Sequence, residues 1–250
     1  MEKISATIIT YNEEKNIERC LKSLQGVAEE IIVVDSFSKD KTKEICLKYN
    51  VQFFARNFKN YSDQKNFAIK QTKYNLMLSI DADEELSDEL KKSIIHIKSN
   101  RKSDGYYFNR ITNYCGKWIK HSGWYPNHQL RLWNKEKGQW VGIIHETLSV
   151  PKNSTTHIKG DLLHFSYENF SQHLLKINTF TDFQAKEMFD NQKSVTFFKI
   201  ICKPFFRFIR HYFIQLGFLD GLEGFIISIH SAYGQFLKYI KLRHLYKNAE

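Results

Sequence analysis

The chain has 250 residues, of which 42% are hydrophobic and 26% are charged, and its formal net charge is +10. This globular composition excludes a disordered or wholly membrane-embedded chain and suits one sizeable α/β domain with an appendage. The positive charge favours anionic partners such as nucleotide phosphates, nucleic acid or an anionic membrane surface. The four cysteines are scattered without metal-ligand spacing, which indicates reduced thiols and a cytosolic compartment.

The first hundred residues alternate between strand-like and helix-like segments. Apolar runs predict strands at Ile4–Thr10, Glu30–Asp35 and Val51–Phe54, and a fourth strand just before Asp81. Helices are predicted after these strands. Asn12 can cap the first helix, and Ser87 can cap another that begins at Asp88. The segment Ser62–Gln71 is predicted to be the third helix. This alternation predicts a doubly wound, mostly parallel sheet whose strand-end acids emerge at one edge.

Two carboxylates, Asp81 and Asp83, follow the fourth predicted strand with one residue between them. Ligands of open α/β sheets bind outside the carboxyl ends of the strands, so both side chains lie where chemistry is expected. Oxygen ligands at this spacing suit Mg²⁺ or Mn²⁺ bridging to a phosphate. An isolated Asp-x-Asp is also compatible with a plain surface turn.

The glycine pattern excludes two common nucleotide-binding classes. No Gly-x-Gly-x-x-Gly follows the first strand, and no Gly-Lys-Ser/Thr loop occurs, which disfavours a dehydrogenase and a P-loop enzyme. A nucleotide held by strand-end acids remains compatible with the sequence.

The middle of the chain is rich in aromatic residues. Gly105–Tyr114 predicts a strand, and the loop after it contains Trp118, Trp124 and Tyr125, which could form a sugar-binding platform or fill gaps beneath the loop. A strand at Gln129–Trp133 carries Arg131, which could contact a diphosphate or form a structural pair with a carboxylate. The later His145-Glu146 pair lacks the spacing of a helical zinc site.

The chain from Glu168 onward is predicted to be helical, with aromatic residues interleaved with Lys and Arg at 195–210 and an apolar companion at 213–242. Basic amphipathic helices of this kind often lie in the headgroup region of an anionic leaflet. The alternative is a helical hairpin packed against the sheet or a second subunit. We expect residues 1–167 to form the catalytic domain and residues 168–250 a C-terminal helical extension.

Several motifs together resemble family 2 glycosyltransferases with the GT-A fold. They are the segments 8–14 and 33–42, Gln64-Lys65-Asn66 and Asp81-Ala82-Asp83. Segments 123–126, 129–132, 145–146 and 217–221 are similar to those of lipopolysaccharide core glucosyltransferases of the WaaE/KdtX type. The resemblance spans nearly the whole chain and implies transfer of a hexose from a nucleotide-sugar, with UDP as the expected nucleotide.

The resemblance also implies roles for individual residues. Metal binding on the donor diphosphate falls to Asp83, with His145 touching the metal or orienting Glu146, and acceptor binding falls to Trp118, Trp124 and Tyr125. Many family members use a Glu-Asp pair for the general base, which this chain lacks at the expected place. Glu146 is therefore our own candidate for the base, with Glu84 or Glu85 as alternatives, and Arg131 would stabilise the leaving diphosphate. The residues implied to bind the nucleotide are Thr10, Tyr11, Glu13, Asp35, Lys65, Asn66 and Asp81.

These roles predict an inverting displacement at the anomeric carbon, in cell-envelope polysaccharide or lipopolysaccharide biosynthesis, by an enzyme peripheral to the inner face of the cytoplasmic membrane. Two other classes compete with this interpretation. A nucleotidyltransferase acting on phosphosugars would need a glycine- and arginine-rich loop near the first strand, and a basic nucleic-acid-binding protein would carry a recognisable binding module. Neither feature is present in the sequence.

Overall fold

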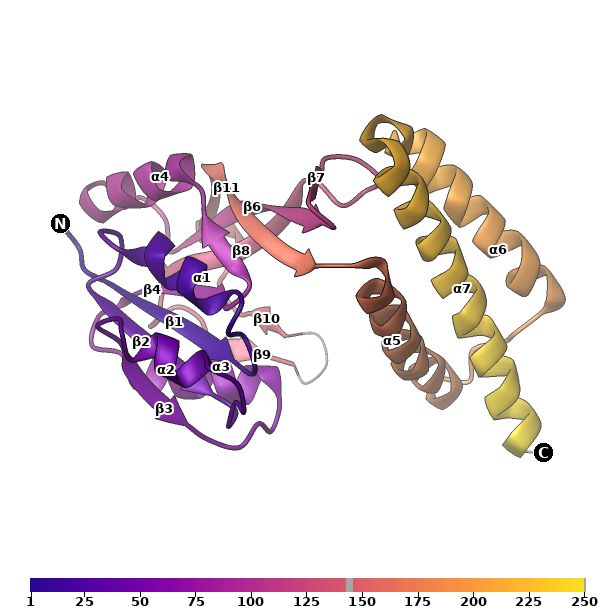
Figure 1. Cartoon of the computed structure of the whole chain (residues 1–250), viewed down its shortest axis with the longest axis horizontal. Coiled ribbons are helices and arrows are strands. Elements are labelled where there is room, and N and C mark those ends of the chain that lie inside the picture. The colour runs from indigo at the N-terminus through magenta and orange to yellow at the C-terminus, as the bar shows by residue number, and fades with distance from the viewer. Residues whose placement is uncertain (143–145, 250) are drawn as a thin grey trace. The chain divides into compact units, whose positions relative to one another are not determined.

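The computed structural model describes residues 1–142 and 146–249, and its contacts divide the chain into two units (Figure 1). The first unit comprises Met1–Arg110 and Asn127–Phe165, and the second comprises Ile111–Pro126 and Ser166–Glu250. The hairpin at 111–126 is expected from the sequence to belong to the catalytic domain of residues 1–167, but its contacts group it with the helices. The reason is hydrophobic packing, because Tyr114 and Ile119 share a buried cluster with Ile227.

The elements alternate as expected through the first hundred residues, and further short strands follow. The strands are β1 (Ile4–Thr10), β2 (Glu30–Asp35), β3 (Gln52–Ala55), β4 (Leu76–Asp81), β5 (Glu84–Leu86), β6 (Gly105–Tyr114), β7 (Lys117–Ile119), β8 (Asn127–Asn134), β9 (Trp140–Val141), β10 (Thr147–Leu148) and β11 (Thr155–Tyr167). The helices are α1 (Ile17–Leu24), α2 (Thr42–Cys46), α3 (Tyr61–Lys70), α4 (Asp88–Ser99), α5 (Phe170–Asp190), α6 (Phe197–Ile209) and α7 (Gly221–Ala249).

One mixed sheet organises the first unit, with strand order β3-β2-β1-β4-β8-β6-β11-β5 and β7 paired to β6. The strands β3, β2, β1 and β4 are parallel, whereas β8 joins β4 antiparallel. In this register Thr10 lies beside Asp35, and Ile9 lies beside Asp81. The two predicted acids therefore emerge at the same edge of the sheet, as expected.

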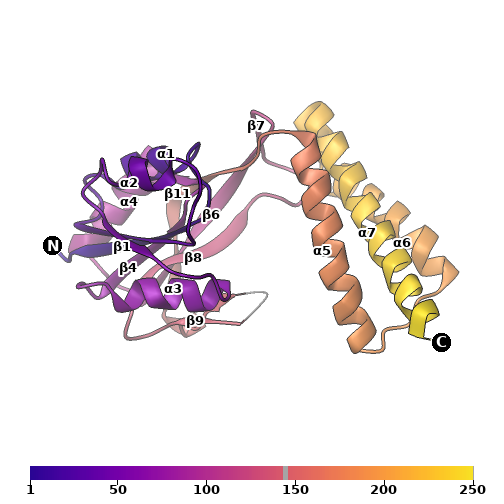
Figure 2. The ribbon, with the colours of Figure 1, turned by 60° about the horizontal axis from the view of Figure 1, so that its bottom comes forward.

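Helices cover both faces of this sheet, with α1, α2 and α4 on one side and α3 on the other (Figure 2). The apolar stripe of α1, which includes Ile17, Leu21 and Leu24, is fully buried in the larger core. On the other face, Ala68 of α3 packs with Ile32 and Val34 of β2 in a separate cluster. Alternate residues of β2 thus enter different cores, which follows from the two-residue period of a strand.

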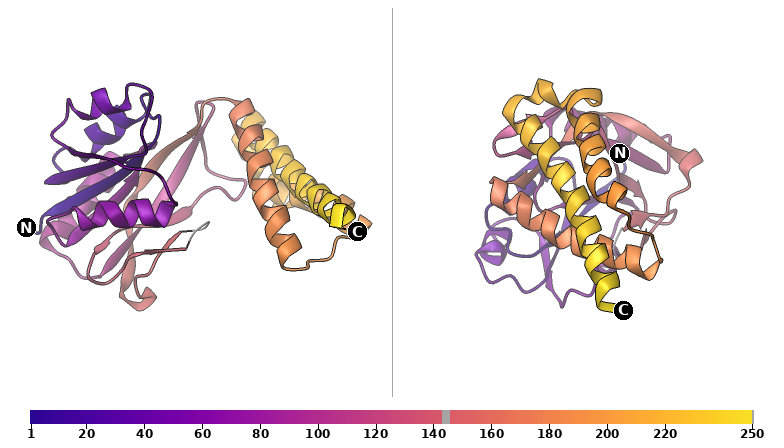
Figure 3. Two further views of the ribbon diagram at one scale, coloured as in Figure 1. Left: turned by 90° about the horizontal axis from the view of Figure 1, so that it is seen from below. Right: turned by 90° about the vertical axis from the view of Figure 1, so that its right-hand side faces the viewer.

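The second unit is built on three helices, and α7 packs against both α5 and α6 (Figure 3). A cluster of Ala185, Ile200, Tyr239 and Leu242 joins them. A π-helical turn at Arg210–Ile214 and a 3-10 turn at Gly217–Asp220 connect α6 to α7. Among the described residues, no single helix is long and apolar enough to cross a membrane, although 197–214 and 217–249 meet that test as a pair bent by 70°.

Candidate active site

A pocket of about 620 Å³ lies at the carboxyl ends of β1 and β4, where the sequence predicts the site. It is lined by Ile9, Thr10, Tyr11, Glu13, Ser36, Phe58, Tyr61, Asp81, Ala82, Asp83 and His164. The hydroxyl of Thr10 is buried and has no hydrogen-bond partner among the described residues, and Tyr11 is 54% exposed. Of the residues expected to bind the nucleotide, Thr10, Tyr11, Glu13 and Asp81 line this pocket.

The rim of the pocket is formed by two strand-end loops that hold one another. The Asn12 amide N–H donates to Ser38 Oγ over 2.8 Å, and the Lys39 N–H donates back to Asn12 Oδ1 over 2.8 Å. Asn12 was expected to cap α1, but its φ of 54° and this exchange show that it braces the second loop instead. Asn16 is the residue that precedes α1, and its side chain makes no capping bond.

Asp35 belongs to the same bracing arrangement. Its side chain is buried and accepts from both the backbone N–H and the hydroxyl of Ser38. Asp35 was expected to contact the base or ribose of a nucleotide. In the structure Ser38 donates to both of its carboxylate oxygens, so Asp35 shapes the rim, and its contact with a nucleotide stays a prediction.

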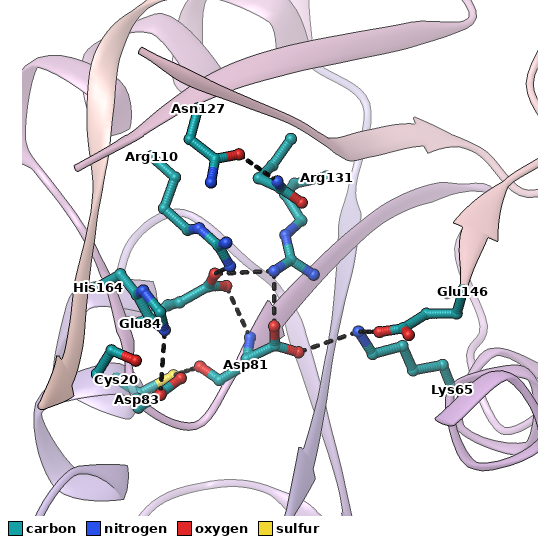
Figure 4. A network of polar contacts seen from close by, with 12 residues as sticks. Cys20, Lys65, Asp81, Asp83, Glu84, Arg110, Asn127, Arg131, Glu146 and His164 are labelled. Carbon is teal, nitrogen blue, oxygen red and sulfur yellow. Dashed lines mark hydrogen bonds and ion pairs between the residues drawn. The ribbon is translucent and has the colours of Figure 1, made fainter. Parts of the chain in front are cut away.

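Asp81, which lines the pocket, is held between the cations of Arg131 and Lys65 (Figure 4). Arg131 Nη2 lies 2.6 Å from Asp81 Oδ2, and Lys65 Nζ lies 3.1 Å from Oδ1. Burial alone would raise the pKa of Asp81, but Arg131 and Lys65 hold it well below its usual range. The carboxylate is thus ionised and fixed in orientation.

Arg131 is itself buried, with only 3% of its side chain exposed, and it also donates to Glu84 over 2.8 Å. Burial opposes its charge, but Asp81 and Glu84 raise its pKa above the ordinary value. These contacts are the structural pairing with a carboxylate that the sequence offered as one of two roles for Arg131. Both carboxylates are bound by Nη2, and Arg131 is not among the residues that line the pocket, so its contacts serve to position Asp81. Contact with a diphosphate, the other role expected of Arg131, stays a prediction.

Glu84 was weighed as an alternative base, but the structure uses it as a buried structural anion. Its side chain has no exposed surface and accepts from Arg131, from Arg110 over 3.3 Å and from the Asp81 N–H over 2.9 Å. A group that is engaged in this way and closed to solvent cannot collect an acceptor proton. Glu85, the other alternative, points to the opposite face of β5 and lies 3.8 Å from Arg19 of α1.

Helix α3 holds the β9–β10 hairpin that carries Glu146. Ser62 Oγ donates to the Gly142 carbonyl over 2.6 Å, and the Asn66 side chain exchanges two hydrogen bonds with the backbone of Trp140. Asn66, expected to flank the nucleotide, therefore clamps the hairpin. Lys65 lies 4.4 Å from the Trp140 ring and bridges Asp81 to Glu146, whose Oε1 is 3.2 Å away.

Glu146 lies close enough to the pocket for its charge to act on Tyr61, as the charges of Asp81 and Asp83 do. Burial of Tyr61, followed by the charges of Glu146, Asp81 and Asp83, raises the pKa of that tyrosine, which lines the pocket. The side chain of Glu146 remains 22% exposed, unlike that of Glu84. It is thus an accessible carboxylate beside the pocket whose position is fixed by Lys65.

Asp83 lines the pocket and contacts His164 of β11, whose Nε2 lies 3.2 Å from Asp83 Oδ2. His164 was missed by sequence reasoning, because only the pairing of β11 with β5 brings it beside the acidic turn. His145, expected at the metal, lies outside the described residues. Within 1–142 and 146–249, no cluster of three or more His, Cys, Asp or Glu side chains could hold a metal by itself.

The aromatic residues expected to bind the acceptor belong to the second unit. Trp124 is half-buried and packs edge-on against Tyr114 and His173, with ring centroids 5.6 and 5.7 Å away. Trp118 lies in β7, which pairs with β6, and Tyr125 precedes Pro126 through a cis peptide bond. These three residues are thus part of a packed hairpin rather than of the 620 Å³ pocket.

The sequence of the chain is similar to those of known glycosyltransferases. Residues 5–154 match the family model described as glycosyl transferase family 2. An uncharacterized glycosyltransferase of Rickettsia typhi is 32% identical over 98% of this chain and 88% of its own length. The lipopolysaccharide core biosynthesis glycosyltransferase LpsC of Rhizobium meliloti is 30% identical over 98% of this chain and 94% of its own.

The fold itself is shared with solved structures at low sequence identity. TarS of S. aureus, residues 1–349 in complex with UDP-GlcNAc, superposes with a TM-score of 0.51 and 16% identity, over 99% of this chain and 92% of that one. The mixed sheet followed by a helical extension is therefore the GT-A arrangement expected from the sequence.

Proposed function

The chain belongs to glycosyltransferase family 2, and we propose that it transfers a hexose from a UDP-sugar to a hydroxyl of a glycan or glycolipid in the biosynthesis of lipopolysaccharide or another cell-envelope polysaccharide. The observation that carries this proposal is the 620 Å³ pocket, in which Thr10, Tyr11 and Asp83 converge on the carboxyl ends of β1 and β4. The likeness to LpsC supports the choice of acceptor class, and the UDP-GlcNAc complex of TarS supports the choice of donor.

In the proposed complex the nucleotide occupies this pocket. The exposed ring of Tyr11 offers a stacking surface for the base, and the unpaired hydroxyl of Thr10 can bond to a polar atom of the donor. Asp81 would accept from a ribose hydroxyl with its orientation already fixed by Arg131 and Lys65. A side chain held in this way loses little entropy when the donor binds.

The residues around Asp83 fit a divalent cation. Magnesium and manganese are commonly held by one or two carboxylates together with substrate phosphates, so an all-protein cluster is not required. Asp83 lines the pocket and could supply an oxygen ligand, and His164 beside it could supply a nitrogen ligand. A bound Mg²⁺ or Mn²⁺ would neutralise the charge that develops on the departing diphosphate.

Glu146 is the proposed general base. It would take the proton of the acceptor hydroxyl while that oxygen attacks the anomeric carbon and the bond to the diphosphate breaks on the opposite side. One carboxylate suffices, because no covalent intermediate forms, and the product is inverted. Lys65 anchors Glu146 to Asp81 and would hold the base and the donor pocket in register.

We also propose that α6 attaches the enzyme peripherally to the inner face of the cytoplasmic membrane. This helix exposes Phe197, Phe198, Phe205 and Phe206, each of them 61% exposed or more. An apolar groove of about 370 Å³ runs between α6 and α7, and the same helix α6 also carries Lys199 and Lys203, which do not line the groove. A helix that combines exposed apolar anchors with cations is suited to an anionic leaflet.

The transferase proposal is tested by thermal-shift assays with UDP, GDP, CDP and ADP, each with and without Mn²⁺. A ligand that binds only the folded chain raises its unfolding temperature. Stabilisation by UDP that depends on Mn²⁺ is expected. Equal shifts with all four nucleotides, or no shift in folded protein, would contradict the assignment of the pocket.

A further inference from the structure

The helical unit contains a second cavity, of about 240 Å³, whose residues play no part in the candidate active site. Its lining includes Trp124, Tyr167, Lys176, Arg207, Gln235 and Lys238. All the lining residues belong to the second unit. The helices α5, α6 and α7 therefore border a partly open polar cavity where an ordinary helical bundle would have apolar contacts.

The cavity is cationic. Lys176 comes from α5, Arg207 from α6 and Lys238 from α7, so each helix contributes one positive side chain. Among the described residues that line the cavity there is no aspartate or glutamate. Three helices thus bring like charges together without a carboxylate in the same cavity.

The hydrogen-bond partners of these cations are neutral. Arg207 Nε donates to Ser231 Oγ over 3.1 Å, and Lys238 Nζ donates to the Gln235 side chain over 3.0 Å. Lys176 Nζ donates to the Ser166 carbonyl over 3.2 Å. Within the described parts of the chain, no ion pair joins any of the three to a carboxylate.

Two carboxylates of this unit pair with other cations. Asp182 lies 2.6 Å from Lys241, and Glu223 lies 3.1 Å from Lys117. Burial, followed by the charges of Arg207 and Lys203, lowers the pKa of Lys238. The cavity therefore disfavours its own positive charges, and a bound anion would relieve that cost.

One wall of the cavity is aromatic. The rings of Trp124 and Tyr167 lie 5.8 Å apart and are tilted by 35°, and Lys176 Nζ lies 4.6 Å from the centre of the Tyr167 ring. Aromatic faces bind apolar surfaces, whereas the adjacent cations and amides bind polar groups. A ligand matched to both would carry a compact ring and an anionic group.

We propose that this cavity binds a sugar that carries a phosphate group, with the phosphate between Arg207 and Lys238 and the sugar ring against Trp124 and Tyr167. The volume of about 240 Å³ lies below the usual range of drug-sized pockets, so it suits a single sugar unit. The further assignment of this sugar to the acceptor rests on the proposed transferase function. The binding of a sugar phosphate does not.

The test is a titration of the full chain with glucose 6-phosphate, followed by tryptophan fluorescence and by calorimetry. Saturating UDP and Mn²⁺ are present so that the donor pocket is filled. Saturable binding of glucose 6-phosphate is expected, with at least tenfold weaker binding of glucose and of inorganic phosphate. Arg207→Gln and Lys238→Gln should each weaken glucose 6-phosphate binding about tenfold, the usual effect of losing one charge-assisted hydrogen bond.

Lys186→Gln is the matched control, because Lys186 is an exposed cation on α5 that does not line the cavity. It should bind glucose 6-phosphate like the unchanged chain. Arg207→Lys keeps the positive charge and should bind more tightly than Arg207→Gln. Circular dichroism of each variant verifies that the helices are retained.

Three results would overturn the proposal. The first is equal affinity of the unchanged chain and both Gln variants, and the second is equal affinity for glucose 6-phosphate and inorganic phosphate. The third is displacement of glucose 6-phosphate by monomeric short-chain phosphatidylglycerol at lower concentration, which would identify a lipid headgroup as the source of the phosphate. If the full chain binds glucose 6-phosphate but not UDP, the transferase function alone is contradicted. If it binds UDP but not glucose 6-phosphate, the proposed ligand of the cavity alone is contradicted.

Discussion

Arg131 lies 2.6 Å from Asp81 and so holds a carboxylate of the pocket from a strand 50 residues further along the chain. The same guanidinium lies 2.8 Å from the fully buried Glu84. The buried guanidinium of Arg131 therefore fixes the acidic turn after β4 through Asp81 and Glu84. Asp83, which is partly exposed and lines the pocket, is left for ligands.

Replacement of Arg131 by Gln should destabilise the fold, because Glu84 would remain buried without its closest cation. Breaking a buried pair in this way costs about 3–5 kcal/mol. The measurement is urea unfolding at neutral pH. Arg19→Gln is the control, because Arg19 lies 3.8 Å from Glu85 with both side chains partly exposed, and it should cost less than about 1 kcal/mol. Equal losses in the two variants would show that Arg131 has no special structural role.

Replacement of Glu146 by Gln should leave donor binding nearly unchanged and lower turnover by about 10²- to 10⁴-fold, the usual contribution of a general base. Turnover is measured as UDP release from a UDP-sugar with water as acceptor, and donor binding is measured separately by titration. Glu85→Gln, a carboxylate paired with Arg19, should keep its turnover. If turnover of Glu146→Gln is also retained, the base lies elsewhere.

Replacement of Phe205 and Phe206 together by Ser should weaken binding to phosphatidylglycerol vesicles at least tenfold, because each buried Phe contributes about 1.5–3 kcal/mol. These side chains are 62% and 61% exposed on α6. Leu47→Ser is the control, because Leu47 is 61% exposed in the first unit. Cosedimentation that is equal for the double variant and the control would argue against the membrane role of α6.

Acid should destabilise the helical unit through His173. Burial, followed by the charges of His230 and Lys176, lowers the pKa of His173 to about 4 from an ordinary value of 6.5. The unfolded chain therefore binds the proton more readily, so the stability contribution is complete above about pH 6.5 and falls by about 3 kcal/mol towards pH 4.

His173→Gln cannot take up this proton, so its helical signal in circular dichroism should lose less thermal stability between pH 7.5 and pH 5 than that of the unchanged chain. His173 Nδ1 lies 2.9 Å from the Tyr114 hydroxyl and 2.9 Å from His230 Nδ1, and a Gln amide offers both a donor and an acceptor to these two groups. Parallel pH profiles for the two proteins would show that His173 does not control the acid response.

The sequence predicts the parts of the fold that depend on local pattern. The strands β1, β2 and β6 lie where the apolar pattern places them, because each is long enough to show it. Helix α5 lies within the segment predicted to be helical from Glu168 onward. The strands β5, β9 and β10 have two or three residues and show no period, so they were not predicted.

Site residues at the ends of strands could be predicted from the sequence. Residues whose role depends on a partner far away in the sequence could not. Asp81 and Asp83 follow an apolar run, which the sequence displays directly. The roles of Asn66 and Glu84 depend on Trp140 and Arg131, which are 74 and 47 residues away. Composition near Asn66 or Glu84 could not reveal those contacts, because only the folded sheet and hairpin create them.

The central claim is that the pocket at the carboxyl ends of β1 and β4 binds a nucleotide diphosphate through a cation at Asp83. The most direct test is calorimetric titration of UDP into the unchanged chain and into Asp83→Asn, each with and without Mn²⁺. Mn²⁺ should tighten UDP binding at least tenfold in the unchanged chain and have little effect in Asp83→Asn, while circular dichroism shows both proteins folded. An equal effect of Mn²⁺ on both proteins, or UDP binding that ignores Mn²⁺ in the unchanged chain, would contradict the account.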